Sequence, residues 1–302
     1  MLTVVALGGN ALMRPGERGT AAEQRANLRT TCEALRPLLD DGDLVVTHGN
    51  GPQVGNELVR QERAADEVPP LPLYLAVAQT QAEIGALLES ELAAVAGRPV
   101  VCLLTHVRVD ENDPAFKRPT KPVGPFYAEE QAAQLESERG WVVAHDSGRG
   151  WRRVVPSPEP LEIVELEAVR TLLAAGTIAV ACGGGGIPVS SRNGRLLGLD
   201  AVIDKDRASS LLAVALGAER LLILTDVDAV YRDWGTAKQE ELRELDITSA
   251  EALRPELAAG SIGPKVEASL AFAQATGHEV LITSAAALAE ALAGRAGTRI
   301  KP

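Results

Sequence analysis

The stretch Ala181–Ser190 reads ACGGGGIPVS, which places four consecutive glycines, Gly183 to Gly186, between an apolar run and Ile187. Glycine loses more backbone freedom on folding than any other residue, so four in a row are unfavourable unless the chain needs bare backbone there. The apolar residues on both sides argue against a flexible linker. The stretch therefore predicts a loop at the end of a buried strand, against which another group presses closely.

Apolar runs like the one before these glycines recur along the chain and predict an α/β fold. Such nearly continuous apolar runs fit strands that are buried on both faces of a parallel sheet. Helical spacing of apolar residues, as in Leu28, Cys32, Leu35 and Leu39, separates them and predicts crossover helices on both faces. The six expected strands are Thr3–Leu7, Leu44–Thr47, Val100–Leu104, Ile178–Cys182, Leu221–Thr225 and Val280–Thr283.

Residues 106–160 interrupt this alternation. They are rich in proline, glycine and charge, and they hold five of the nine aromatic residues of the chain. A structureless loop of this length is uncommon inside a compact domain. The region therefore predicts a small inserted subdomain, or lid.

Composition argues against several classes of partner. The 302 residues include 41 acidic and 30 basic side chains, a formal net charge of −11, which disfavours binding to nucleic acid or to an anionic membrane surface. We expect no signal peptide and no membrane span, because no apolar stretch is long enough. Cys32, Cys102 and Cys182 form no CxxC pair, so we expect reduced thiols and a cytoplasmic protein.

Three glycine clusters follow three of the expected strands. Gly8 and Gly9 come after the first, Gly49 and Gly51 after the second, and the four glycines after the fourth. Ligands of open parallel sheets bind beyond the carboxyl ends of the strands, where loops and helix N-termini meet. Loops with bare backbone at this edge would supply unhindered N–H groups, which favours an anion site over simple turn chemistry.

Lysines stand near two expected helix starts. Lys205 lies between two aspartates in VIDKDRAS, and Lys265 follows Pro264 in GSIGPK. Phosphoryl transfer requires this combination, because its catalysis is mostly alignment plus positive charge and N–H donors. The sequence contains no GxxxxGK[ST], GxSxG or HExxH motif, so a P-loop kinase is excluded. We expect a structural hydrogen-bonding role for His48.

Together these motifs resemble the carbamate kinases, a branch of the amino acid kinase superfamily. The resemblance covers residues 3 to about 283 and is strongest in three branch-specific stretches, TKPVGPF, GRGWRRVVPSP and the lysine of IDKD. Other matching stretches are VVALGGNAL, THGNGPQVGN, CGGGGIPV, AVIDKDRAS and GSIGPKVEA.

The resemblance implies a fold and a reaction. We expect one domain over residues 1–302, a three-layer α/β sandwich with a mainly parallel eight-stranded sheet and a small protruding subdomain. Residues 1–196, with the lid at about 106–160, would bind carbamate and the phosphoryl group, and residues 197–302 would bind the nucleotide. The expected activity is reversible phosphoryl transfer between ATP and carbamate, giving ADP and carbamoyl phosphate. Mg²⁺, a homodimer and a place in arginine metabolism are also implied.

The resemblance also implies roles for individual residues. Lys205 and Lys265 would neutralise the migrating phosphoryl group from opposite sides, Asp206 would orient both lysines, and Lys121 would cover carbamate from the lid. The expected cradle for substrate and phosphoryl group comprises Gly8, Gly9, Asn10, Gly49, Asn50, Gly51 and one wall made of Gly183, Gly184, Gly185 and Gly186. The nucleotide would be framed by Lys265 together with Thr225, Asp226, Val227, Asp228 and Tyr231.

Three alternatives remain open at this point. Another amino acid kinase could act on a carboxylate or a nucleotide, although Lys205 and TKPVGPF argue against it. A non-catalytic sensor could be built on the same fold, although no expected lysine or glycine cluster is missing. The spacing of Gly49, Gly51 and Gly55 is a weak match to a dinucleotide-binding fingerprint and leaves an NAD-dependent oxidoreductase as a distant third.

Overall fold

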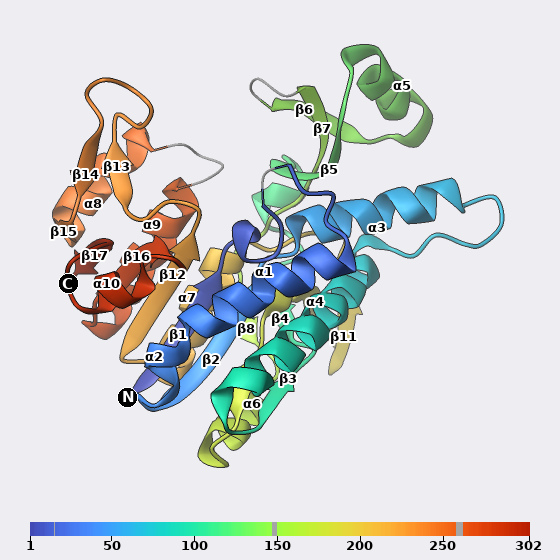
Figure 1. The fold of residues 1–302 in the computed structure, drawn as a ribbon. Coiled ribbons are helices and arrows are strands. Elements are labelled where there is room, and N and C mark those ends of the chain that lie inside the picture. Colours follow the sequence, from blue (N-terminus) through green and yellow to red (C-terminus); the bar gives the residue numbers. More distant parts are fainter. Residues whose placement is uncertain (15, 147–149, 258–261) are drawn as a thin grey trace.

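The central sheet organises the molecule (Figure 1). The computed structural model describes residues 1–14, 16–146, 150–257 and 262–302, with only the backbone of Asn10 and Asp146. Over these residues the sheet has eight strands in the order β15-β17-β16-β12-β1-β2-β9-β3. Their bounds are β1 Leu2–Leu7, β2 Asp43–His48, β3 Val100–Cys102, β9 Ile178–Val180, β12 Arg220–Thr225, β15 Glu244–Asp246, β16 Val280–Ser284 and β17 Thr298–Lys301.

All six apolar runs expected to be strands lie in this sheet, and each pairs in parallel with its neighbours from the same group. The expected mainly parallel sheet is confirmed, with β17 antiparallel to β16. Alternate residues of β1 enter opposite cores, Val4 and Ala6 on one face and Val5 and Leu7 on the other. Burial on both faces is why the run is apolar without a break.

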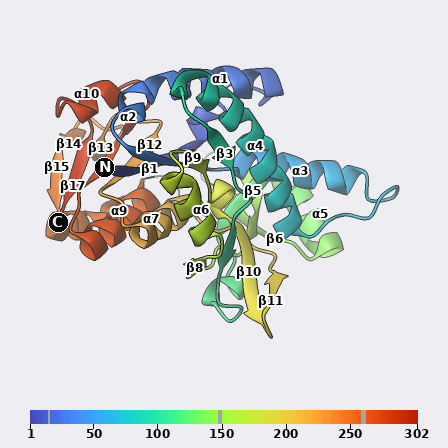
Figure 2. The same cartoon turned by 90° about the horizontal axis from the view of Figure 1, so that it is seen from below.

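Helices cover both faces of the sheet, which is seen edge-on between its two helical layers in Figure 2. One layer contains α1 and α4, which pack on each other, and the other contains α7 and α9. Gly217 ends α7 in the left-handed conformation, as glycine commonly does at a helix C-terminus. The helix bounds are α1 Ala21–Ala34, α2 Arg36–Leu39, α3 Gly51–Arg63, α4 Leu73–Ala96, α6 Leu166–Ala174, α7 Lys205–Leu216, α8 Ile247–Leu253, α9 Gly263–Thr276 and α10 Leu288–Leu292.

The region expected to be a lid divides into two parts. Its first strand, β4 (His106–Arg108), pairs with β8 (Glu162–Ile163) and β10 (Ile187–Arg192), and β10 pairs with β11 (Arg195–Gly198) to complete a second sheet. The protruding part at the top of Figure 1 is narrower than residues 106–160. It contains the sheet β5-β7-β6 and one helix, with bounds β5 Lys121–Tyr127, α5 Glu129–Arg139, β6 Val142–Asp146 and β7 Gly150–Val155.

The expected boundary between residues 196 and 197 falls inside strand β11, because β10 and β11 form an antiparallel hairpin. After this hairpin the chain continues to α7. The remaining short elements are β13 Val230–Arg232, β14 Glu240–Leu242, η1 Gly9–Ala11, η2 Pro114–Phe116, η3 Gly183–Gly185 and η4 Arg254–Glu256.

The structure bears on two expectations from the sequence, the absence of a membrane span and the reduced cysteines. Within the described residues, no helix combines the length and apolar character needed to cross a membrane. Cys32, Cys102 and Cys182 are free thiols, and Cys32 and Cys182 are buried. Burial raises the pKa of the Cys32 thiol to about 12, so this residue stays protonated at neutral pH. The cytoplasmic location stays a prediction.

The order of the sheet brings the three glycine clusters together. β1, β2 and β9 are neighbours, and the clusters follow the carboxyl end of each. Helix α3 begins at Gly51, the last glycine of the second cluster. The convergence expected from the sequence therefore exists, and it places backbone N–H groups and helix N-termini at one edge.

Candidate active site

A pocket of about 240 Å³ lies at this edge of the sheet. Its lining comes from the glycine loops, from the lid strand β5 and from the first turns of α3, α7 and α9. Nine residues expected from the sequence line it: Gly9, Gly49, Asn50, Gly51, Lys121, Gly184, Lys205, Asp206 and Lys265. Leu12, Gln53, Val202, Ile203 and Asp204 also line it and were not assigned a role from the sequence.

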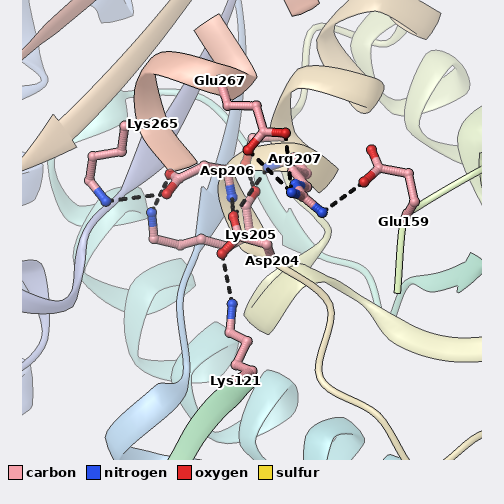
Figure 3. A network of polar contacts seen from close by, with 9 residues as sticks. Lys121, Glu159, Asp204, Lys205, Asp206, Arg207, Lys265 and Glu267 are labelled. Carbon is pink, nitrogen blue, oxygen red and sulfur yellow. Dashed lines mark hydrogen bonds and ion pairs between the residues drawn. The ribbon is translucent and has the colours of Figure 1, made fainter. Parts of the chain in front are cut away.

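Two lysines from different helices share one carboxylate in this pocket (Figure 3). Lys205 Nζ lies 2.5 Å from Asp206 Oδ1, and Lys265 Nζ lies 3.2 Å from Asp206 Oδ2. The side chains of these three residues are nearly buried, with exposures of 13%, 12% and 4% for Lys205, Lys265 and Asp206. The first turns of α7 and α9 are thus joined around a fixed cluster of positive charge.

Together, burial and the neighbouring charges lower the pKa values of both Asp206 and Lys205, for different reasons. Burial raises the pKa of Asp206, but attraction to Lys205 and Lys265 outweighs it, so the pKa of this carboxyl lies below its ordinary value. Burial lowers the pKa of Lys205, and the Lys265 charge lowers it further, while Asp206 acts in the opposite direction. Two cations beside one anion leave a net positive charge, which an anionic ligand would neutralise.

Asp204 links the lid to the start of α7. It is the N-cap residue of this helix, and its Oδ1 accepts hydrogen bonds from the N–H groups of Asp206 and Arg207. Its other oxygen lies 2.7 Å from Lys121 Nζ at the beginning of lid strand β5. Burial raises the pKa of Asp204, but Lys121 outweighs it and holds that pKa well below the usual range. Aspartate directly before an expected helix start could have predicted the cap.

Arg207 forms a second bridge between α7 and α9, on the side of Asp206 away from the lysines in Figure 3. Its Nη2 lies 3.2 Å and 3.1 Å from the two carboxylate oxygens of Glu267 on α9. Its Nη1 lies 2.8 Å from Oε2 of Glu159, in the segment that returns from the lid. The guanidinium therefore ties both lysine-bearing helices to the chain that follows the lid.

Glycine is required at several positions by close packing. A Cβ on Gly49 would lie 3.0 Å from Cδ of Lys205, so bare backbone there leaves space for the lysine stem. A Cβ on Gly8 would lie 2.6 Å from the carbonyl oxygen of Leu224 on strand β12. Gly8 lines a different pocket, between α1 and the loop after β16, although Gly9 lines the lysine pocket. Asn10 lies in η1, and its side chain is outside the described part of the chain.

The four glycines of the opening stretch have a different explanation from the one expected. A Cβ at each of them would meet protein atoms: His48 and Gln81 at Gly183, Asn50 at Gly184, Ile203 at Gly185 and Val107 at Gly186. Of the four, only Gly184 lines the lysine pocket. Gly184, Gly185 and Gly186 also have φ values of +65°, +90° and +88°, which L side chains rarely adopt. The loop allows neighbouring side chains to pack around the pocket, rather than forming its whole wall.

Two polar side chains, of His48 and Asn50, form hydrogen bonds at the second glycine cluster. The Asn50 amide donates to Thr80 Oγ1 on α4 at 2.9 Å, so its orientation is fixed. His48 is buried, with Nδ1 lying 3.0 Å from the carbonyl oxygen of Gly49. Burial lowers the pKa of His48 to about 4, so the ring is neutral at pH 7. This geometry agrees with the structural hydrogen-bonding role expected for it.

A second pocket, of about 700 Å³, lies beside the hairpin of β13 and β14. Asp226, Val227 and Tyr231, expected to frame a nucleotide, line it. Asp226 also lines the pocket that contains Gly8 and Thr225, and Asp228 Oδ1 accepts a hydrogen bond from the Tyr231 hydroxyl at 2.8 Å. Trp234, which sequence reasoning missed, lines the second pocket with 60% of its surface exposed and its ring centroid 4.9 Å from that of Tyr231.

The chain is similar to known proteins over nearly its whole length. The model of the amino acid kinase family matches residues 1–284. A carbamate kinase from Pyrococcus horikoshii is 43% identical, with 99% of this chain and 98% of that protein covered. One from Haemophilus influenzae is 45% identical, with 99% and 96% covered. The structure of carbamate kinase from Giardia lamblia bound to AMP-PNP superposes with a TM-score of 0.91 at 40% identity, covering 99% and 98% of the two chains.

Proposed function

The chain belongs to the amino acid kinase family, among its carbamate kinases, and we propose that its reaction takes place in the pocket of Lys205, Asp206 and Lys265. The reaction is phosphoryl transfer between ATP and carbamate, with ADP and carbamoyl phosphate on the other side. The observation that supports this location is the pair of nearly buried ammonium groups on one carboxylate, at the N-termini of two helices.

The lysines match the charge that develops during transfer. The migrating phosphoryl group spreads negative charge over its equatorial oxygens, so fixed cations beside it lower the barrier without rearranging. Lys205 and Lys265 would bind these oxygens, while Asp206 keeps both ammonium groups aligned. Backbone N–H groups near Gly9, Gly49 and Gly51 would complete the cradle. Gly8, Gly183, Gly185 and Gly186 do not line the lysine pocket, and the side chain of Asn10 is outside the described part of the chain, so their predicted roles remain proposals.

The nucleotide would occupy the second pocket and reach toward Lys265. Tyr231 and Trp234 offer aromatic surface for a base. Asp226 and Val227 line the same pocket, and Thr225 and Asp226 line the pocket that contains Gly8. The Giardia lamblia relative bound to AMP-PNP supports a nucleotide as substrate. Carbamate would bind on the opposite side of the transferring group, under Lys121 of the lid.

Mg²⁺ would enter with the nucleotide. Among the residues that the structure describes, no group of three or more His, Cys, Asp or Glu side chains could hold a metal ion. The pocket carboxylates Asp204 and Asp206 are paired with lysines. This donor set fits Mg²⁺, which is commonly bound by substrate phosphates and water with few protein ligands. The ion would supply additional positive charge to the phosphates.

A homodimer is the proposed assembly. The hairpin of β10 and β11 extends from the body in Figure 2, and its edge strand exposes Leu196 and Leu197, at 44% and 41%. Leu104 and Leu161, at 49% and 45%, are further exposed leucines. Exposed apolar residues on a projecting strand favour pairing with a second copy. Sedimentation velocity would measure the oligomeric state of the wild type and of a Leu196→Ser, Leu197→Ser variant. We expect a dimer for the wild type and a monomer for the variant.

The activity is tested by ATP formation from ADP and carbamoyl phosphate, using the purified full-length chain. We expect ATP to appear with added Mg²⁺ and to be strongly reduced by a chelator. N-acetylglutamate and UMP, tested with ATP as donor, serve as controls for the other amino acid kinase activities. Phosphorylation of either, without turnover of carbamoyl phosphate, would contradict the proposal. No turnover of any of these substrates would favour the non-catalytic sensor.

A further inference from the structure

Gln53 lines the lysine pocket from the first turn of α3 and is only 4% exposed. Its amide group is held by a second glutamine from the neighbouring helix α1, Gln24, which is also 4% exposed. Gln53 Nε2 lies 2.9 Å from Gln24 Oε1, and Gln24 Nε2 lies 3.0 Å from the carbonyl oxygen of Gly19. The three groups form a short relay behind the pocket.

The relay fixes which end of each amide is the donor. The carbonyl oxygen of Gly19 can only accept, so the nearby atom of Gln24 must be its NH₂ group. The other end of Gln24 is then an oxygen, and it can only accept from the NH₂ group of Gln53. The oxygen of Gln53 is therefore directed away from Gln24 as a hydrogen-bond acceptor.

That acceptor, Gln53 Oε1, is buried and has no hydrogen-bond partner among the residues that the structure describes. A buried polar atom without a partner is uncommon in folded proteins and costs free energy. The neighbouring carboxylates of Asp204 and Asp206 are already paired with ammonium groups. Gln53, which lines a pocket together with three lysines, thus carries a hydrogen-bond acceptor that the described residues leave unused.

We propose that Gln53 Oε1 accepts a hydrogen bond from the NH₂ group of carbamate and carbamoyl phosphate, and so selects the carbamoyl group over acyl groups of the same size. This inference rests on the proposed function. Lysines and backbone N–H groups recognise the oxygens that carbamate shares with acetate. The NH₂ group is the part that acetate replaces with a methyl group, and only a hydrogen-bond acceptor distinguishes the two.

The strength of this selection follows from the burial of Gln53. A methyl group in place of NH₂ would leave Oε1 without a partner in the complex, next to an apolar surface. Sites that hydrogen-bond a substrate NH or OH group reject the analogue that lacks it more strongly than apolar pockets reject a small change in shape. We therefore expect a preference of at least about tenfold in kcat/KM for carbamoyl phosphate over acetyl phosphate.

The test compares two phosphoryl donors in the ATP-forming direction. Transfer from carbamoyl phosphate to ADP leaves carbamate, and transfer from acetyl phosphate leaves acetate, so one ATP assay measures both reactions. In Gln53→Met the acceptor is replaced by a thioether of similar length. We expect kcat/KM for carbamoyl phosphate to fall by about tenfold or more, because one hydrogen bond to substrate is lost. The value for acetyl phosphate should stay within about threefold, because the methyl group never used that acceptor.

Two further variants make the result specific. Gln24→Met keeps the Gln53 side chain but removes Gln24 Oε1, the atom that orients the Gln53 amide. We therefore expect a partial loss of the preference for carbamoyl phosphate over acetyl phosphate. Gln134→Met is the matched control, because Gln134 is an exposed glutamine of lid helix α5 whose side chain donates to Glu138 on the same helix. Its preference should equal that of the wild type.

The outcomes separate this inference from the proposed function. A wild-type chain that does not turn over carbamoyl phosphate contradicts the proposed function. If the wild type is active but uses carbamoyl phosphate and acetyl phosphate equally well, the proposed role of Gln53 is overturned and the proposed function stands. Equal losses for both donors in folded Gln53→Met also overturn it, because they would indicate a packing role.

Discussion

The two pockets at the carboxyl edge of the sheet are built in opposite ways. The pocket of Lys205 is small, about 240 Å³, and its charged side chains are nearly buried and ion-paired. The pocket of Tyr231 and Trp234 is larger, about 700 Å³, and Trp234 is 60% exposed. Buried charges must be fixed by partners, whereas an aromatic surface can bind a ligand without rigid support. Changes in the first pocket should therefore alter the rate of reaction, and changes in the second should alter affinity.

The largest effect is expected for Lys205→Ala. The substitution removes one cation from the transferring group and leaves Asp206 with Lys265 alone, so we expect kcat to fall by about a thousandfold. Steady-state ATP formation at saturating ADP and carbamoyl phosphate measures it. Lys301→Ala is the control. Lys301 is an exposed residue of β17, a strand distant from the lysine pocket, and its side chain pairs with Glu244 of β15. Retention of a tenth or more of wild-type kcat would show that Lys205 does not assist the transfer.

A smaller effect on the same step is expected for Arg207→Met. Arg207 does not line the lysine pocket, but its bond to Glu267 holds α7 against α9 close to Lys205 and Lys265. Because misplacement of reacting groups is costly, we expect kcat to fall by about tenfold with little change in KM. Arg207→Lys should recover part of the loss.

The double variant with Glu267→Gln distinguishes this positioning role from general stability. If the two residues act through one bridge, the double variant should be no slower than the slower single variant. Arg295→Met, which breaks the exposed pair with Glu290, is the matched control and should keep wild-type kcat. If folded Arg207→Met keeps the wild-type kcat, the ion pairs of Asp206 with Lys205 and Lys265 are sufficient to position the two lysines.

The smallest effect is expected for Trp234→Ala, in the second pocket. Stacking of an aromatic side chain on a base contributes modestly to binding, so we expect the KM for ADP to rise about fivefold. The kcat value should not change, because the lysine cluster is untouched. A fall in kcat at saturating ADP would contradict the division of roles between the two pockets.

Sequence reasoning succeeded where a local pattern has a single physical cause. Burial on both faces makes a strand continuously apolar, so the runs ending at Leu7 and Thr225 were identifiable as strands of the sheet. Glycines and lysines after such strands then predicted the edge where they meet. The bounds of the lid were less accurate, because pairing of His106–Arg108 with β10 joins residues about 80 positions apart.

The missed residues gave weak or ambiguous signals. Asp204 could be seen as a helix cap, but its pair with Lys121 depends on how the lid folds back over α7. Arg207 and Glu267 are charged residues on separate helices, and such residues are usually solvated. Gln53 is one glutamine in a short motif, and its acceptor role depends on Gln24 from another helix.

Local composition and spacing were enough to predict the class of fold, the edge of the sheet at which the glycine loops meet and the positive charge at that edge. The tertiary structure decided which glycines face the pocket and which serve packing, since that depends on side chains such as Asn50 and Val107 from distant segments. It also decided how the charges are paired. The distance between two ammonium groups and one carboxylate is set by the packing of α7 against α9, and no stretch of sequence records it.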